Sequence, residues 1–124
     1  MPVRSLSASV ATWPDAATVE RAVQDWAASI AAAEPRVIRV GFFGSYARGD
    51  WGVGSDADLI VIVREDCRPF PARGSAFDAT ALPVPADVLV YTEEEWRRLS
   101  LEPGFGRRAA AEVVWVYPGR AGRG

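Results

Sequence analysis

The sequence predicts an α/β (α+β) fold made of a single domain, residues 1–124. Apolar residues recur at helical spacing in one early segment and form short, continuous runs in later ones, which is the pattern of a helix followed by strands. The chain has 124 residues, of which 49% are hydrophobic. A chain of this length and composition can bury a core without disulfides or metal ions. No internal repeat or long linker divides it.

The first helix is expected from about Pro14 to Ala33. Thr12 and Asp15 form a capping-box pattern, and Pro14 suits the first turn of a helix. Pro35 is expected to end it. The apolar face of this helix consists of Val19, Val23, Trp26, Ile30 and Ala33.

Four strands are expected after the first helix. The second of them is apolar on both faces, as a central strand covered on both sides should be. Further helices are expected between the later strands, one capped by Thr92 and continuing to about Leu99, and one from Phe105 to Glu112. The expected strands are Val37–Phe43, Asp58–Val63, Asp87–Tyr91 and Val113–Tyr117.

Four other segments are expected to be irregular. Residues 48–55 form a glycine-rich loop, and residues 64–85, rich in Pro, Gly and Ala, show no obvious helix. Residues 1–11 and 118–124 are predicted to be flexible. No run approaches the roughly 20 apolar residues that cross a bilayer, so we expect no membrane association.

The composition excludes several kinds of chemistry. The chain has no histidine, and all of its 14 basic residues are arginine. Histidine bases, Schiff-base lysines and the P-loop lysine are therefore excluded. Cys67 is the only cysteine, so no intrachain disulfide forms, which suits a cytoplasmic protein. The net charge of −2 argues against extended nucleic-acid binding.

Paired carboxylates indicate a metal site. Asp56 and Asp58 lie two residues apart at the start of a strand, so their side chains point to the same face and repel each other unless a cation lies between them. Oxygen ligands favour Mg²⁺. Asp87 opens the next clear strand and offers a third carboxylate, which would allow two Mg²⁺ ions. Asp78 is its rival, but Ala79–Pro85 contains two prolines and makes a poor central strand.

A second group of residues suits a nucleotide. Gly44 and Ser45 follow a strand where a helix or turn begins, and backbone N–H groups at such a point attract phosphate. Arg48 is either a phosphate ligand or a surface ion-pair partner. Ser55 is placed in the nucleotide site, or it caps the turn into the acidic pair. Trp51 either stacks on a base or covers the core.

These motifs resemble a known family. Gly44-Ser45, ten intervening residues and Asp56-x-Asp58 are similar to the signature of the DNA polymerase β-like nucleotidyltransferase superfamily, and Gly-Ser-x-Ala-Arg-Gly…Ser-Asp-x-Asp-Leu resembles its minimal nucleotidyltransferase branch. The resemblance implies the polymerase β-like fold, a small mixed sheet flanked by helices. It also implies that Asp56 and Asp58 bind two metals, that Asp87 binds one of them, and that Gly44 and Ser45 bind the β- and γ-phosphates.

The same resemblance implies a function. Such a protein moves a nucleoside monophosphate, with AMP from ATP as the default, to a hydroxyl acceptor. Minimal nucleotidyltransferases of this kind are paired with an all-helical HEPN protein in toxin–antitoxin modules, where they act as the antitoxin by adding AMP to the HEPN toxin. Two other interpretations stay open: a partner-binding antitoxin without catalysis, and a nucleotide sensor. An oligomer is compatible with the sequence.

Overall fold

The computed structural model describes residues 14–52 and 54–118. The predicted flexibility of residues 1–11, most of the predicted flexible tail 118–124, and the capping role of Thr12 lie outside this range. The first described helix, α2 (Ala16–Ala33), begins two residues later than predicted. Asp15 is its N-cap and accepts a hydrogen bond from the Thr18 N–H at 2.8 Å, so Pro14 precedes the helix.

Four strands form one mixed sheet, in the order β3-β2-β1-β4. β1 (Val37–Phe43) pairs antiparallel with both β2 (Ala57–Val63) and β4 (Val114–Tyr117). β3 (Ala86–Thr92) pairs parallel with β2. The predicted small mixed sheet is therefore confirmed, with strand ends shifted by one residue at several places.

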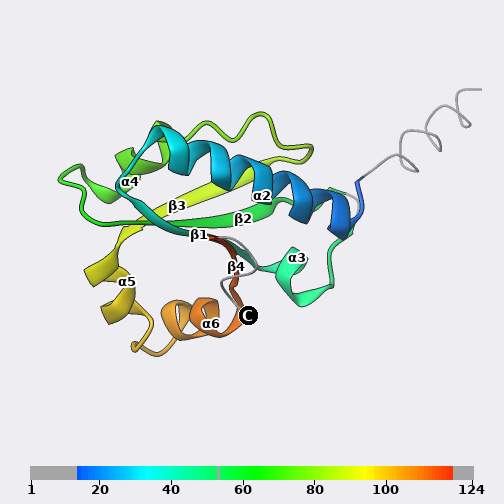
Figure 1. Cartoon of the computed structure of the whole chain (residues 1–124). Helices are drawn as coiled ribbons and strands as arrows, with labels where there is room; N and C mark the ends of the chain where they lie inside the picture. The colour runs from blue at the N-terminus through cyan, green and yellow to red at the C-terminus, as the bar shows by residue number, and fades with distance from the viewer. Residues whose placement is uncertain (1–13, 53, 119–124) are drawn as a thin grey trace, which may run out of the picture.

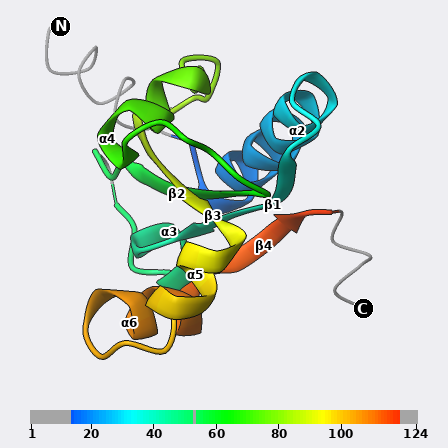
Figure 2. The ribbon, with the colours of Figure 1, turned by 90° about the vertical axis from the view of Figure 1, so that its left-hand side faces the viewer.

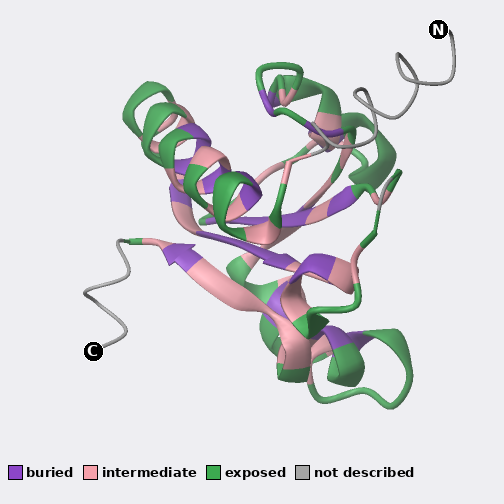
Figure 3. Ribbon diagram, turned by 90° about the vertical axis from the view of Figure 1, so that its right-hand side faces the viewer, coloured by how far each residue is buried: buried purple, intermediate pink, exposed green. Residues whose placement is uncertain are grey.

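Helices cover both faces of this sheet (Figures 1 and 2). α2 packs on one face, and α5 (Glu93–Leu99) and α6 (Phe105–Glu112) pack on the other. Successive side chains of β2 point to opposite faces of the sheet, so the strand contributes to both core clusters. Leu59 and Val61 pack in the cluster under α2, and Ile60 and Ile62 pack in the cluster under α5 and α6. Figure 3 shows the buried residues concentrated along the strands. None of the described helices has the length and apolar character needed to cross a bilayer.

The segment 64–85 contains two short helical elements that the sequence did not indicate, α4 (Phe70–Arg73) and the 3-10 turn η1 (Gly74–Ala76). Arg73 anchors them. Its side chain is buried, donates to the Glu95 carboxylate at 2.6 and 3.2 Å, and also donates to the Arg68 and Val90 carbonyls. A single turn fixed by such distant contacts has no periodicity to detect.

We expect Arg73→Met to destabilise the fold by about 2–3 kcal/mol, because it removes charge-assisted hydrogen bonds and leaves buried carbonyls without a donor. Urea denaturation followed by tryptophan fluorescence measures the change. Arg98→Met is the control, since Arg98 pairs with Glu94 only at 4.0 Å and on the exposed surface. Equal losses in both variants would show that Arg73 is not an anchor.

Candidate active site

Three segments meet at one end of the sheet. Asp58 lies directly opposite Asp87 in the parallel β2–β3 register, and Phe43, the last residue of β1, lies opposite Asp58 on the other side. The turn Gly44-Ser45 therefore leaves β1 beside the acidic pair. Asp58 and Asp87 are therefore neighbours at this end of the sheet, and Asp56 lies just before the start of β2.

Gly44 is required by both its conformation and its surroundings. Its φ of +81° and ψ of −149° belong to a region that only glycine adopts readily. A Cβ atom at this position would also overlap the Oδ2 atom of Asp58. The backbone of the turn thus lies directly against the Asp58 carboxylate. A triphosphate that contacts both the turn and cations bound to the carboxylates would need these two groups to be this close.

A cavity of about 440 Å³ opens at this point. The turn and β2 supply one part of its lining, namely Gly44, Ser45, Arg48, Asp56 and Asp58. The end of β1 and one face of α6 supply the rest: Phe43, Phe105, Arg108, Ala109 and Glu112. None of the α6 residues is among the site residues that the sequence predicts.

Asp58 carries uncompensated negative charge. Burial raises the pKa of its carboxyl, and the nearby charges of Asp87, Asp56 and Glu112 raise it further, against the single opposing effect of Arg48. Carboxylate oxygens with excess negative charge are a donor set that fits Mg²⁺. Within the described residues, no three acidic side chains are already arranged to enclose one ion. The chemistry of the donors thus fits the predicted metal, while the ligand roles stay a prediction.

Asp87 is exposed and lines a different cavity, of about 980 Å³. Residues 74–88 form its walls, including the apolar side chains Phe77, Leu82 and Val84. Among the described residues, those that line this cavity include no arginine. The acidic cluster therefore lies between two spaces of different character, one beside the Gly44-Ser45 turn and one beside Asp87.

Comparison with known proteins bears on this arrangement. A family model described as "Nucleotidyltransferase domain" matches residues 26–113, which include the whole acidic cluster and the turn. This chain belongs to the nucleotidyltransferase domain family. A comparison with curated proteins finds no match.

Two solved structures are similar to this nucleotidyltransferase domain in fold. One is a protein from Sulfolobus solfataricus provisionally classed as a nucleotidyltransferase, with 19% identity, a TM-score of 0.61 and coverage of 86% of this chain and 85% of that one. The other is a toxin–antitoxin with AMP-PNP, with 17% identity, a TM-score of 0.54 and coverage of 80% and 76%. At these identities the likeness establishes the fold alone.

Ser55 and Arg48, which were predicted to bind the nucleotide, make contacts with nearby residues of the domain. The Ser55 hydroxyl accepts a hydrogen bond from the Gly52 N–H at 2.8 Å and does not line the 440 Å³ cavity, which favours the turn-capping alternative. Arg48 lines that cavity and also pairs with Asp50 at 3.0 Å and Glu112 at 3.3 Å. Both alternatives for Arg48, ion pair and phosphate ligand, therefore remain compatible with its position.

Glu112 is a site residue that sequence reasoning missed. Its carboxylate accepts a hydrogen bond from the Gly44 N–H at 3.2 Å, across 68 residues of sequence. It lies at the end of α6, whose pattern indicated only a helix. No local signal marks such a contact, because it depends on how α6 packs beneath β1.

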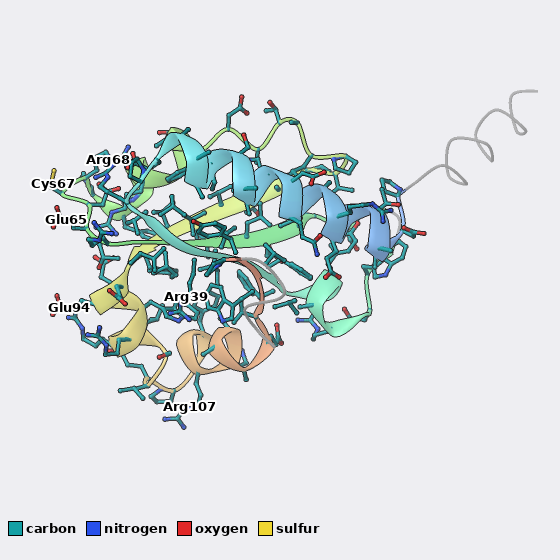
Figure 4. The ribbon with its side chains drawn as sticks, viewed as in Figure 1. Arg39, Glu65, Cys67, Arg68, Glu94 and Arg107 are labelled. Atoms are coloured by element: carbon teal, nitrogen blue, oxygen red, sulfur yellow. The ribbon has the colours of Figure 1, made fainter. Side chains whose placement is uncertain are left out.

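Two other sequence candidates are engaged by contacts within the protein. Asp78, the rival of Asp87, lines the same 980 Å³ cavity, and its carboxylate accepts hydrogen bonds from the Thr80 N–H and hydroxyl and stabilises a turn. Trp51 stacks on Tyr46 with ring centroids 5.5 Å apart and packs against the core, which favours its core-covering role. Cys67 is exposed at the end of the sheet away from α3 (Ser45–Arg48) (Figure 4).

Proposed function

We propose that this domain transfers a nucleoside monophosphate, with AMP from ATP as the default, to a hydroxyl group of a protein partner. The observation that carries the proposal is the pairing of Asp58 with Asp87 across β2 and β3, beside the Gly44-Ser45 turn. Carboxylates next to a turn that can hold phosphates form the arrangement needed for in-line displacement at phosphorus.

Each part of the site has a role in this proposal. The Gly44-Ser45 turn binds the terminal phosphates, and Asp56, Asp58 and Asp87 would hold two Mg²⁺ ions. Bound Mg²⁺ supplies positive charge that neutralises the phosphates and acidifies an acceptor hydroxyl. Asp87 accepts the proton of that hydroxyl as its oxygen attacks the α-phosphorus. The bond to the β-phosphate oxygen breaks, and pyrophosphate leaves with its charge balanced by Arg48 and Arg108.

The cavity beside Asp87 supports a protein as the acceptor. Binding of a nucleic-acid end relies on arginine or lysine against phosphates, and the described lining of this cavity contains neither. Its lining combines the largely buried Phe77, Leu82 and Val84 with the polar Ser75 and Thr80, and this mixture suits an uncharged side chain that carries a hydroxyl. The fold similarity to a toxin–antitoxin supports a toxin as this partner, with the domain as its antitoxin. That the toxin is a HEPN protein, and that the pair acts in the cytoplasm, rests on the resemblance of the sequence motifs to minimal nucleotidyltransferases.

The test is incubation of the purified domain with ATP, Mg²⁺ and a HEPN protein whose gene adjoins that of the domain. We expect the partner's mass to increase by one AMP, measured by intact mass spectrometry, and to stay unchanged with Asp87→Ala, which removes the proton acceptor. An unmodified partner with the wild-type domain would contradict the proposal. If the double variant Asp56→Asn, Asp58→Asn still silences the toxin, neutralisation occurs by binding without catalysis.

Two of the tryptophans that the structure describes, Trp26 and Trp96, are buried in the core. Trp115 is half-buried, contacts Trp96 edge-on with 5.8 Å between ring centroids and lies under the Arg39 guanidinium. A partner surface built on tryptophan, which the alternative without catalysis would use, therefore cannot draw on Trp26 or Trp96.

A further inference from the structure

The Glu112 carboxylate contacts two groups that bind phosphate in the proposed function, the Gly44 N–H and the Arg48 guanidinium. Its Oε1 atom accepts from the Gly44 N–H at 3.2 Å, and both of its oxygens lie 3.3 Å from the Arg48 Nη1 atom. A phosphate oxygen seeks the same donors, a backbone N–H and a guanidinium. The carboxylate also lines the same cavity as Asp56 and Asp58.

We propose that Glu112 holds the place of a triphosphate oxygen in the nucleotide-free protein, so that a nucleotide binds by displacing its carboxylate from Gly44 and Arg48. The inference rests on the proposed function, because it takes the Gly44-Ser45 turn as the phosphate site. In this inference the Glu112 carboxylate competes with the triphosphate for the same donors and thereby lowers the affinity for the triphosphate.

The position of Glu112 is otherwise unfavourable for a carboxylate. It is the last residue of α6, where the helix dipole disfavours negative charge. It also lines the same cavity as Asp58, a second carboxylate whose like charge repels it. Hydrogen bonds from the Gly44 N–H and Arg48 offset these two effects, and a triphosphate takes over both donors.

Displacement is sterically simple. The Glu112 side chain is 27% exposed, so part of it already faces solvent, and a glutamate reaches its partners through rotatable bonds. When the carboxylate leaves, Arg48 keeps its second partner, Asp50, at 3.0 Å. Arg48 therefore stays beside the cavity, ready to contact the incoming phosphate.

The test is calorimetric titration of the wild type and three variants with ATP, inorganic tripolyphosphate and adenosine in Mg²⁺ buffer. Glu112→Gln removes the charge and weakens the contact. Glu112→Asp keeps the charge but shortens the reach to Gly44. Asp50→Asn is the matched control, since it removes a carboxylate that pairs with Arg48 but does not line the cavity.

We expect both Glu112 variants to bind ATP and tripolyphosphate about tenfold more tightly than the wild type, the size of effect that one charge-assisted hydrogen bond supports. Asp50→Asn should bind them with a much smaller gain, and adenosine affinity should be the same in all four proteins. In the amide spectrum of Glu112→Asp, the Gly44 resonance should shift because its N–H loses the carboxylate.

Each other outcome overturns the inference in a distinct way. Tighter binding by Glu112→Gln and Asp50→Asn alike, with none by Glu112→Asp, would mean that general charge repulsion is the cause. Weaker triphosphate binding by the Glu112 variants would make Glu112 a positioning residue for Arg48. Wild-type binding with no gain in any variant would overturn the inference alone, whereas no triphosphate binding by any of the proteins would overturn the proposed function with it.

Discussion

Asp58→Asn should reduce nucleotidyl transfer by at least about a thousandfold and at the same time raise the midpoint of thermal unfolding. The loss of transfer follows from the central place of Asp58, which lies opposite Asp87 and against the Gly44 backbone. Removing a carboxylate that holds Mg²⁺ removes several kcal/mol of charge stabilisation from the transition state, and about 1.4 kcal/mol corresponds to each factor of ten in rate.

The gain in stability follows from electrostatics. Folding raises the pKa of Asp58 above its ordinary value of 3.8, first through burial and then through the neighbouring carboxylates. Because its pKa is higher in the folded state, protonated Asp58 stabilises the fold, and this stabilisation is fully present below the pKa of the unfolded state. The stabilisation is lost as the pH rises through the pKa of the folded state. At neutral pH the ionised carboxylate therefore opposes folding, and the neutral amide of Asn relieves it.

Thermal unfolding without added metal measures this prediction across a pH series. The variant should be more stable than the wild type near neutral pH, and the difference should shrink as the pH falls into the acid range and wild-type Asp58 becomes protonated. Added Mg²⁺ should stabilise the wild type more than the variant. Inactivity accompanied by a lower unfolding midpoint would instead indicate a structural role for Asp58.

The sequence predicts those features of the site that depend on the order of residues within one segment. The two-residue spacing of Asp56 and Asp58 at the start of a strand places them on one face in any sheet that contains that strand. The sequence also predicts that a helix or turn begins at Gly44-Ser45, and α3 starts there, directly after Gly44. These features, with the strand and helix periods, account for the fold class and for most of the element boundaries.

Features that arise from packing between distant segments were not predictable. Glu112 meets Gly44 across 68 residues, and Arg73 meets Glu95 across 22. Neither pair leaves a pattern in the local sequence, because each depends on which helix covers which strand. Ser55 shows why both of its alternatives were left open: its place in the motif suggests a nucleotide ligand, and its hydroxyl accepts a hydrogen bond from Gly52 in the same loop, which favours the capping role.

Gly44→Ala should reduce transfer by about a hundredfold, and it tests the proposed contact between turn and carboxylate most directly. The new methyl group would overlap the Asp58 Oδ2 atom, so either Asp58 or the phosphate-binding turn must move. A misplacement of about 1 Å in a reacting geometry is enough for a loss of this size. The substitution also strains a backbone with φ of +81°, which costs stability by itself.

Gly104→Ala separates these two effects. Gly104 precedes α6 with a φ of +95° and a ψ of −137°, close to the conformation of Gly44, but a Cβ atom there meets nothing within 4 Å. Both variants should therefore lose about 1–3 kcal/mol of stability through backbone strain, whereas only Gly44→Ala should lose transfer. Denaturation curves and initial rates at saturating ATP measure the two quantities. Equal losses of transfer in both variants would mean that destabilisation alone inactivates the domain and that the Gly44–Asp58 approach has no special part in the chemistry.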